Sequence, residues 1–388
     1  MKIALVSPYD YPYPGGVTGH IAHLEENFRQ MGHSVKIIAP SSSDKRAMAA
    51  ENVLVVGRPV SIPVSGSIAR IAVSPRLSGR VKQILDQERF DIVHLHEPLV
   101  PVLPITILRF SKSINIGTFH AYADRNLGYF YGKRILKRWF RKLDGKIAVS
   151  KPAMEFVRQY FPGYYNIIPN GIDYEHFSAE VPALPEFDDG RLNILFVGRM
   201  EKRKGFKYLL RAYARVKIQF PNCRLIVVGP RGRLSEEYQS VVEKSRLEDV
   251  VFTGYVPYAV LPRYYRSAHV FCSPATGQES FGIVLLEAMA AGRPIVASNI
   301  EGYASVVEHG TEGLLVPPKD VDALSAAILK LLRDRDLREM MSEQGRLTAQ
   351  EYSWKRVSRK VLAYYERLLS ESGPEPSAIA PRLATAEG

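Results

Sequence analysis

Short, almost unbroken apolar runs recur along the chain, and longer segments with helical periodicity separate them. Such runs are typical of parallel strands that helices cover on both faces, because neither face of the strand meets water. We therefore predict an α/β protein. Its expected strands are 2–7, 34–40, 91–96, 115–120, 146–150 and 165–169, followed by 192–198, 223–229, 249–254, 268–274, 294–298 and 313–317.

The pattern restarts in the middle of the chain, which indicates two Rossmann-like domains, each a doubly wound parallel sheet. Between them the segment 178–191, SAEVPALPEFDDGR, has no apolar period, and we interpret it as a linker. The predicted domains are 1–177 and 192–351, with the ligand site in the interdomain cleft at the carboxyl ends of the strands. Residues 373–388 are predicted to form a disordered tail.

Composition narrows the class of protein. Hydrophobic residues make up 46% of the 388 residues and charged residues 24%, as in a globular domain. The two cysteines, Cys223 and Cys272, lie in apolar runs, which indicates buried thiols in a reducing compartment and excludes a disulfide framework. The apolar run at the N-terminus is too short for a signal peptide, and no stretch suits a transmembrane helix. We therefore expect a cytoplasmic protein.

The net charge of +12 is concentrated in one region and favours an anionic partner. In the segment 129–143, Ile135, Leu136, Trp139, Phe140 and Leu143 fall at helical spacing on one side. Such a helix can lie in a lipid headgroup layer, or it can pack on its own sheet with a basic outer face. No nucleic-acid-binding fold is recognisable, so nucleic acid is not expected as a partner. The basic residues of the region are Arg125, Lys133, Arg134, Lys137, Arg138, Arg141, Lys142, Lys146 and Lys151.

The stretch ESFGIVLLEAMAAG places Glu279 and Glu287 eight positions apart around an apolar run. If a helix begins near Gly282, its unpaired backbone N–H groups suit a phosphate. The loop carboxylate of Glu279 then suits sugar hydroxyls, and Glu287 a ribose. Alternatively, the helix dipole merely favours an acid at its N-terminus, and Glu287 is an ordinary helical residue.

Two further segments carry residues that suit a diphosphate. Gly15 and Gly16 lie between the first strand and a helix, where they allow backbone to approach an anion, although a plain turn is the alternative. Arg199 and Lys204 follow the first strand of the second domain, and they either bind phosphates or form a solvated basic loop. The glycines do not form the GxGxxG pattern, so a nicotinamide-binding fingerprint is absent.

Histidines end two of the expected strands. His120 is expected to face the cleft. His94, His96 and Glu97 could indicate a metal site, because alternate residues of a strand share one face, but no further ligand cluster is evident and a structural role is favoured. No Asp-x-Asp motif accompanies these predicted site residues, so we expect neither a metal nor a cofactor.

Together these segments resemble the retaining GT-B glycosyltransferases of family four over about residues 1–370. The resemblance rests on Glu279 and Glu287 in their shared stretch, on PNGID at 169–173, on VGRMEKRKG at 197–205 and on the PGG loop. HEP at 96–98 and TFH at 118–120 are most similar to the phosphatidylinositol mannosyltransferases. The resemblance also implies that the helical segment 352–370 crosses back to the first domain.

The resemblance implies a role for each matching residue. His120, Arg199, Lys204 and Glu279 would be catalytic. The donor nucleotide sugar would be bound by Gly15, Gly16, Arg199, Lys204, Val256, Glu279, Phe281, Gly282, Ile283 and Glu287. The membrane surface would be met by Lys133, Arg134, Lys137, Arg138, Trp139, Arg141 and Lys142.

This chain departs from those mannosyltransferases on the acceptor side. Thr18, Leu99 and Ala121 replace their Gln, Asn and Thr, so polar groups for an inositol ring are partly lost. Tyr258 lies near the position at which those mannosyltransferases carry an acidic residue that could recognise the guanine base. These departures leave the acceptor and the donor base open.

We thus expect retaining, metal-independent transfer of a hexosyl group by a peripheral protein on the cytoplasmic face of the cell membrane. The favoured donor is GDP-mannose and the favoured acceptor is a lipid such as phosphatidylinositol. A first alternative is a UDP-sugar-dependent enzyme that acts on a diacylglycerol-type lipid or a soluble sugar. A more distant alternative is a non-catalytic GT-B protein that docks on membranes. The oligomeric state stays open.

Overall fold

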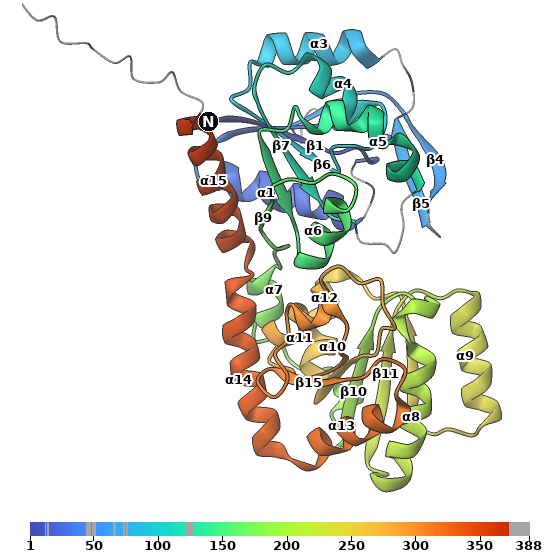
Figure 1. Cartoon of the computed structure of the whole chain (residues 1–388). Coiled ribbons are helices and arrows are strands. Elements are labelled where there is room, and N and C mark those ends of the chain that lie inside the picture. The colour runs from blue at the N-terminus through green and yellow to red at the C-terminus, as the bar shows by residue number, and fades with distance from the viewer. Residues whose placement is uncertain are drawn as a thin grey trace, which may run out of the picture.

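A computed structural model describes residues 1–11, 13, 15–43, 48, 52–64, 67–72, 74, 77–121 and 127–371. It consists of two α/β lobes, one above the other, with the long helices α14 (Arg335–Glu351) and α15 (Trp354–Glu371) running along one side of both (Figure 1). The predicted α/β class with two parallel-sheet domains is confirmed.

The first lobe is built on a sheet in the order β3-β2-β1-β6-β7-β8-β9, as far as the described residues show. Its strands pair in parallel throughout, and their apolar runs are buried because helices cover both faces. The chain order reverses between β1 and β6, where the carboxyl ends of such strands open a crevice. The strands are β1 (Lys2–Val6), β2 (Ser34–Ala39), β3 (Val53–Val55), β6 (Ile92–His96), β7 (Ile114–Phe119), β8 (Gly145–Ala148) and β9 (Asn166–Ile167).

The second lobe repeats this arrangement on a sheet in the order β12-β11-β10-β13-β14-β15 within the described part of the chain. All pairs are again parallel, and the order reverses between β10 and β13. Separate apolar clusters cover its two faces. The strands are β10 (Leu192–Val197), β11 (Cys223–Val228), β12 (Val250–Gly254), β13 (Val270–Ser273), β14 (Ile295–Ser298) and β15 (Gly313–Val316).

Helices connect the strands and cover the sheets. Those of the first lobe are α1 (Gly16–Gln30), α3 (Leu77–Glu88), α4 (Leu103–Phe110), α5 (Leu127–Phe140) and α6 (Lys151–Arg158). Those that follow are α7 (Tyr174–Ser178), α8 (Phe206–Gln219), α9 (Arg233–Lys244), α10 (Leu261–Ser267), α11 (Ile283–Ala290), α12 (Glu301–Ala304) and α13 (Val321–Arg333). None of the described helices is long and apolar enough to cross a bilayer.

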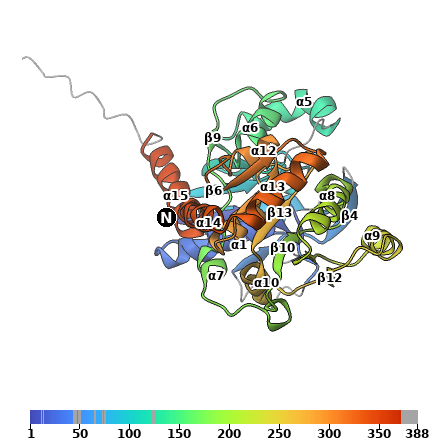
Figure 2. The same cartoon turned by 90° about the horizontal axis from the view of Figure 1, so that it is seen from below.

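The C-terminal end of the chain returns from the second lobe to the first. Helix α14 packs against α11, whereas α15 packs against α1, and both views place α15 beside α1 (Figures 1 and 2). Val357, Val361 and Tyr365 recur at four-residue intervals and bury one face of α15 in the core of the first lobe. The predicted tail 373–388 lies outside the described residues.

The crossing between the lobes is held by backbone contacts. Ile172 donates its N–H to the carbonyl of Tyr352 at 2.8 Å, and Trp354 donates to the carbonyl of Ile172 at 3.1 Å. Gly171 lies directly beneath the indole, because a Cβ added there would lie 2.5 Å from Trp354. The two chain segments that join the lobes are therefore tied to each other.

The structure differs from the sequence prediction in two places. The segment expected to be a linker is partly packed, because Leu184 and Phe187 are buried in the core of the second lobe together with Phe177 of α7. In addition, β3 and the antiparallel hairpin of β4 (Pro59–Val64) and β5 (Ser67–Ala72) were not predicted. These strands are hard to recognise in the sequence, because β4 contains prolines and β3 is only a short strand.

Gly205 offers a test of how closely the loops of the second lobe pack. It has a φ of 71°, and an added Cβ would lie 1.8 Å from the carbonyl oxygen of Pro274. We expect Gly205→Ala to lower the free energy of unfolding by about 3 kcal/mol, because both backbone strain and overlap result. Gly190 has a φ of 81° but open space around it. Gly190→Ala should therefore introduce backbone strain without overlap and lower the free energy of unfolding by about 1 kcal/mol. Equal urea midpoints for the two variants would contradict this packing.

Candidate active site

The predicted site residues follow the carboxyl ends of strands at the switch points of both sheets. His96 ends β6, His120 follows β7, and the segment that contains Arg199 and Lys204 follows β10. Helix α12 of the second lobe contacts α6 of the first, so the lobes meet on this side (Figure 1). This is the place where open α/β sheets bind their ligands.

Glu279 is the centre of a compact charge cluster in the second lobe. Its Oε1 lies 2.7 Å from Nζ of Lys204 and 2.5 Å from Nη1 of Arg203. The side chains of Glu279 and Lys204 are only 12% and 16% exposed, so this pairing is shielded from water. With Arg199 and Glu201, which pair beside them, the site has three cations and two carboxylates, and this net positive charge suits a phosphate.

Arg203 was not among the predicted site residues. It also donates to the carbonyl of Gln278 at 3.2 Å and pairs through Nε with Glu201 at 2.7 Å. The only signal in the sequence was its place beside Lys204 in the basic run KRKG, which does not tell which cation turns inward.

Arg199 lies apart from this cluster. Its side chain is 63% exposed and pairs with Oε1 of Glu201 at 3.1 Å. An exposed guanidinium on the loop after β10 can turn toward a ligand without breaking a buried contact. The predicted diphosphate-binding pair thus contains one anchored cation, Lys204, and one exposed cation, Arg199.

Close backbone contacts fix the two loops that carry these charges. Thr276 donates its N–H to the carbonyl of Arg203 at 2.7 Å. Gly302 lies against the carbonyl of Glu279, and a Cβ added to it would lie 1.9 Å from that oxygen. Glycine is therefore required there for the loop before α11 to sit against α12.

Helix α11 begins as predicted, directly after Gly282. Gly282 has a φ of 93°, and the ring of Tyr303 packs so closely that an added Cβ would lie 2.7 Å from it. Phe281 is buried, and Ile283 opens the helix. The first turn leaves unpaired N–H groups beside the charge cluster of Glu279.

Glu287 lies in the second turn of α11. Its Oε2 accepts the hydroxyl proton of Tyr265 at 2.7 Å. Burial raises the pKa of the carboxyl to about 7, although the bond from Tyr265 opposes this. Glu287 therefore changes charge near neutral pH. Val256 and Tyr258, at the end of β12, are half-buried and exposed, respectively.

The glycine turn of the first lobe begins α1. Gly16 is exposed, and a Cβ added to it would meet nothing within 4 Å, so a ligand has room there. The hydroxyl of Thr18 donates to the carbonyls of Tyr13 and Gly15 at 2.9 and 3.0 Å. Thr18 thus stabilises the turn itself.

Of the three acceptor-side positions, Ala121 alone is exposed. Thr18 bonds within its own turn, and Leu99 is buried in the apolar core of the first lobe. That these three positions lie on the acceptor side stays a prediction. Threonine satisfies its hydroxyl locally, and leucine gains from burial.

Glu97 positions the segment of His120. Its Oε1 accepts the backbone N–H groups of His120 and Ala121 at 2.7 and 2.8 Å. Glu97 is buried with a φ of 51°, and burial raises the pKa of its carboxyl. Its carboxylate therefore fixes the backbone of His120 and Ala121 and is not free to contact a ligand.

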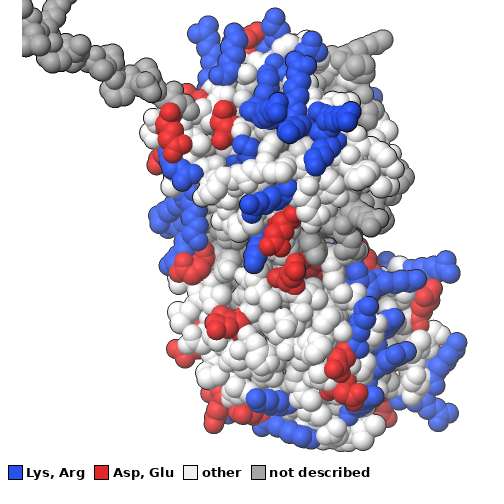
Figure 3. Space-filling model, viewed as in Figure 1, with Lys and Arg blue, Asp and Glu red and all other residues white. Residues whose placement is uncertain are grey.

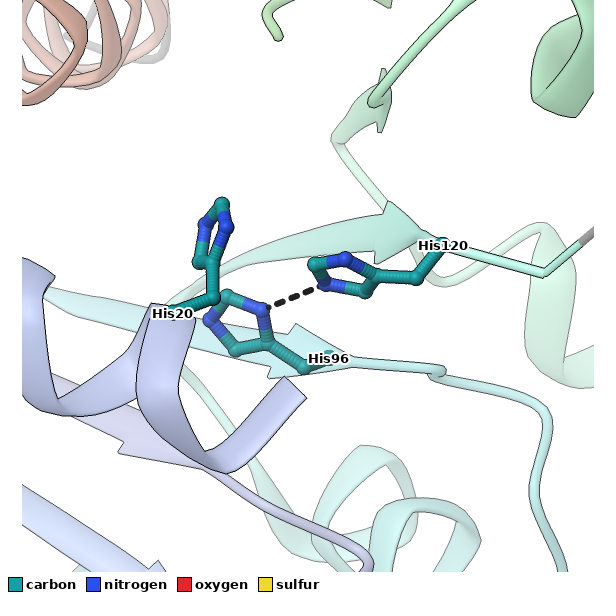
Figure 4. A group of neighbouring side chains, drawn as sticks. All are labelled: His20, His96 and His120. Carbon is teal, nitrogen blue, oxygen red and sulfur yellow. Dashed lines mark hydrogen bonds between the residues drawn. The ribbon is translucent and has the colours of Figure 1, made fainter. Parts of the chain in front are cut away.

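The ring of His120 belongs to a cluster with His20 and His96 (Figure 4). Nε2 of His120 lies 3.0 Å from Nδ1 of His96, and His20 approaches both from α1. Burial lowers the pKa of His20 to about 4 and the pKa values of His96 and His120 well below their usual range. All three rings are therefore neutral at pH 7.

This cluster corrects the prediction that no further ligand group accompanies the strand histidines. His94 is structural as expected, since its ring bonds the hydroxyls of Tyr365 and Thr118, both at 2.6 Å. His96, in contrast, meets His20, which lies 76 positions earlier on a helix. No local spacing in the sequence brings these two residues together.

Helix α5 carries the predicted membrane surface. Its inner face packs on the core through Tyr129, Leu136 and Phe140. Its basic residues are exposed, and Lys and Arg side chains gather on this part of the first lobe (Figure 3). Trp139 is half-buried between the cations of Arg138 and Lys142. Arg125 lies outside the described residues.

The outer face of α5 is apolar as well as basic. Leu127, Phe130, Tyr131 and Ile135 are 67%, 65%, 80% and 72% exposed. Ile135 was predicted to lie on one side of the helix together with Leu136. This is wrong, because Leu136 packs on the core whereas Ile135 is exposed. Together with Lys133, Arg134, Lys137, Arg138 and Arg141 these four residues form what we call the α5 face.

Comparisons with known proteins agree with this architecture. Residues 14–176 match the model of glycosyltransferase family 4, and residues 179–348 match that of glycosyl transferases group 1. The phosphatidyl-myo-inositol mannosyltransferase of Mycobacterium leprae is 36% identical over 367 residues, 94% of this chain and 96% of that protein. The protein of the same name from Propionibacterium freudenreichii is 34% identical over 94% of both chains.

Solved structures share the fold at lower identity. A glycosyltransferase from Rickettsia africae has a TM-score of 0.76 and 19% identity, with 96% of this chain and 99% of that chain covered. An Anabaena protein in complex with UDP-glucose has a TM-score of 0.73 and 18% identity, with 95% and 100% covered.

The raised pKa of Glu287 makes stability depend on pH. Its pKa is about 7 in the folded chain against 4.5 for an ordinary glutamate, so the folded state binds the extra proton between these values. The stabilisation is complete below pH 4.5 and is lost as pH rises through 7. As the pH is raised from 5 to 8, we expect the free energy of unfolding of Glu287→Gln to increase by about 2–3 kcal/mol relative to that of the parent.

Urea midpoints at the two pH values measure this difference. Glu180→Gln, at an exposed position, is the control and should show none. A pH-independent difference for Glu287→Gln would refute the assignment.

Proposed function

Because this chain belongs to family four of the glycosyltransferases, with a GT-B fold, we propose that it transfers a mannosyl group from GDP-mannose to phosphatidylinositol or a related lipid. The observation that carries the proposal is the extended identity to proteins named phosphatidyl-myo-inositol mannosyltransferases. The charge cluster of Glu279 supports it, since it supplies the groups that a donor diphosphate and its sugar require.

In the proposed mechanism, positive groups of the second lobe stabilise the departing diphosphate. Lys204 is anchored at the site, Arg199 can turn inward, and α11 begins four residues after Glu279 with unpaired N–H groups. Charge stabilisation of this kind can replace a metal ion. Gly16 gives the diphosphate room at the start of α1.

The sugar is proposed to lie between Glu279, which accepts its hydroxyl groups, and the ring of His120. Glu287 binds the ribose. A donor hydroxyl must then compete with Arg203 or Lys204 for the Glu279 carboxylate, and Arg203 is the more exposed of the two at 30%. Donor binding thus releases Arg203 from Glu279.

We propose that the reaction retains the configuration of the sugar by attack on the leaving-group side, with a donor phosphate oxygen taking the acceptor's proton. A double displacement would need a carboxylate free to attack the sugar. Among the described residues, Glu97 is the carboxylate nearest to His120, and its Oε1 is occupied by two backbone N–H groups. This geometry supports the single step.

The lipid acceptor is proposed to reach the first lobe from the inner face of the cell membrane. The α5 face combines exposed apolar side chains with cations, and α5 contains no acid. Aromatic and aliphatic groups can enter the headgroup layer while the cations meet anionic lipids. Apolar side chains this exposed gain nothing from the protein's own core, which favours docking over simple packing.

A second candidate keeps the reaction and changes the substrates. Tyr258, stacked on His176 with ring centroids 4.5 Å apart, stands where an acid could read guanine. Leu99 and Thr18 offer no polar group to an inositol ring. These features favour a UDP-sugar as the donor and a diacylglycerol-type lipid or a soluble sugar as the acceptor.

The donor site is tested by Lys204→Ala and Glu279→Gln. We expect each variant to lower kcat for donor turnover by about 100-fold or more, because each removes charge or hydrogen bonds at the leaving diphosphate or the sugar. Lys202→Ala, an exposed cation of the same loop, is the matched control.

Turnover of GDP-mannose and UDP-glucose is compared with and without vesicles that contain phosphatidylinositol or diacylglycerol. Dependence on GDP-mannose and phosphatidylinositol supports the first proposal, and a UDP-glucose response supports the second. Unchanged turnover in Lys204→Ala and Glu279→Gln would refute both.

The α5 face is tested by the double variant Phe130→Ser with Ile135→Ser. We expect its partition onto vesicles with anionic lipid to fall by about tenfold or more, since two apolar anchors are lost. Ile218→Ser removes a side chain that is 81% exposed on α8 and should bind as the parent does. Equal flotation of the double variant and the control would exclude docking through α5.

A further inference from the structure

Two members of the histidine cluster have no part in the proposed transfer. His120 is proposed to meet the donor sugar, but His20 and His96, which lie beside it (Figure 4), are buried and contact no expected ligand. Buried imidazoles gathered from three separate segments need a physical reason, because each loses the hydration of its ring nitrogens.

The spacing of the three rings matches the arrangement of imidazoles around one metal ion. Their centroids are 5.1 Å apart for His20 and His96, 4.9 Å for His20 and His120, and 5.2 Å for His96 and His120. Rings that each bind a tetrahedral Zn²⁺ through nitrogen at about 2 Å have centroids about 5 Å apart. One ring nitrogen from each lies within 4.8 Å of the others.

A second observation points to a missing ligand at this place. His96 is completely buried, and its Nε2 has no hydrogen-bond partner among the described residues. An unpaired buried polar atom of this kind destabilises a protein by about 1–3 kcal/mol. Such atoms are uncommon in folded proteins, and an ion bound at Nε2 would satisfy this one.

Neighbouring groups hold two of the three ligand residues in place, and the hydrogen bond between Nδ1 of His96 and Nε2 of His120 gives way when the ion binds. Nδ1 of His20 lies 2.9 Å from Oδ1 of Asn170, so the amide oxygen accepts the Nδ1 proton and leaves the lone pair on Nε2. Glu97 fixes the backbone of His120. Orientation of ligand histidines by outer carbonyls and carboxylates is usual at metal centres.

The position of the cluster also allows the ion to enter from solvent. His20 and His96 are buried, whereas His120 is half-buried. The exposed side of His120 therefore leaves a fourth position open, as in zinc sites with three protein ligands.

We propose that His20, His96 and His120 bind one divalent transition-metal ion of the zinc type. The ion binds a ring nitrogen of His120, the side chain that is proposed to meet the donor sugar. It therefore inhibits the transfer. The inhibition rests on the proposed function, whereas the binding does not.

Binding is measured first with Co²⁺, whose visible absorption reports nitrogen ligands, followed by displacement with Zn²⁺ on the full-length protein. One Co²⁺ per chain with ligand-field bands is the expected result. His20→Asn and His96→Asn should each weaken binding about 100-fold, and Asn170→Ala about 10-fold. His33→Asn, outside the cluster, is the control and should bind as the parent does.

His20→Cys separates a lost ligand from a damaged fold, because a thiolate also binds these ions. It should bind Co²⁺ with an added charge-transfer band from sulfur. Absence of ligand-field absorption in the parent, or equal binding by His20→Asn, would overturn the proposed site.

Donor turnover tests the second part. Zn²⁺ should inhibit the parent, and a chelator should reverse this, while His20→Asn should keep its own metal-free rate when Zn²⁺ is added. Binding of Co²⁺ without inhibition by Zn²⁺ would overturn the regulatory role. If no donor is turned over at all, the proposed function fails, and the absorption titration still decides the metal site.

Discussion

The carboxylate of Glu279 between Lys204 and Arg203 is the interaction on which the donor side of the molecule depends. It is nearly buried, and loss of one partner from a buried pair costs about 3–5 kcal/mol. The cluster persists because glycines let its loops touch through backbone, Gly205 against Pro274 and Gly302 against Glu279. Lys204 and Glu279 are therefore held in place by the fold of the second lobe itself.

Much of the architecture was predictable, because parallel strands that are covered on both faces appear in the sequence as nearly continuous apolar runs. Strands such as 2–7 and 192–198 are nearly all apolar, and the corresponding β1 and β10 are buried. The start of α11 was predictable for a related reason, since Gly282 interrupts an apolar run at the point where the chain needs a positive φ. Features of this kind depend only on local sequence.

The remaining features depend on contacts between distant segments. Arg203 and Lys204 are equivalent in sequence, and only the loop that carries Glu279 decides that both turn inward. Leu184 was read as linker because single apolar residues among prolines show no period, although the second lobe buries it. His20 joins its cluster only through the packing of α1 on the first sheet.

The returning helix α15 explains why the two lobes form one functional unit. Tyr365 of α15 bonds His94 on β6, the strand that ends in His96, and the indole of Trp354 lies edge-on to His20 at 4.9 Å. The same indole covers Gly171 at the crossing between the lobes. The histidine cluster of the first lobe is thus supported by the segment that leads out of the second lobe.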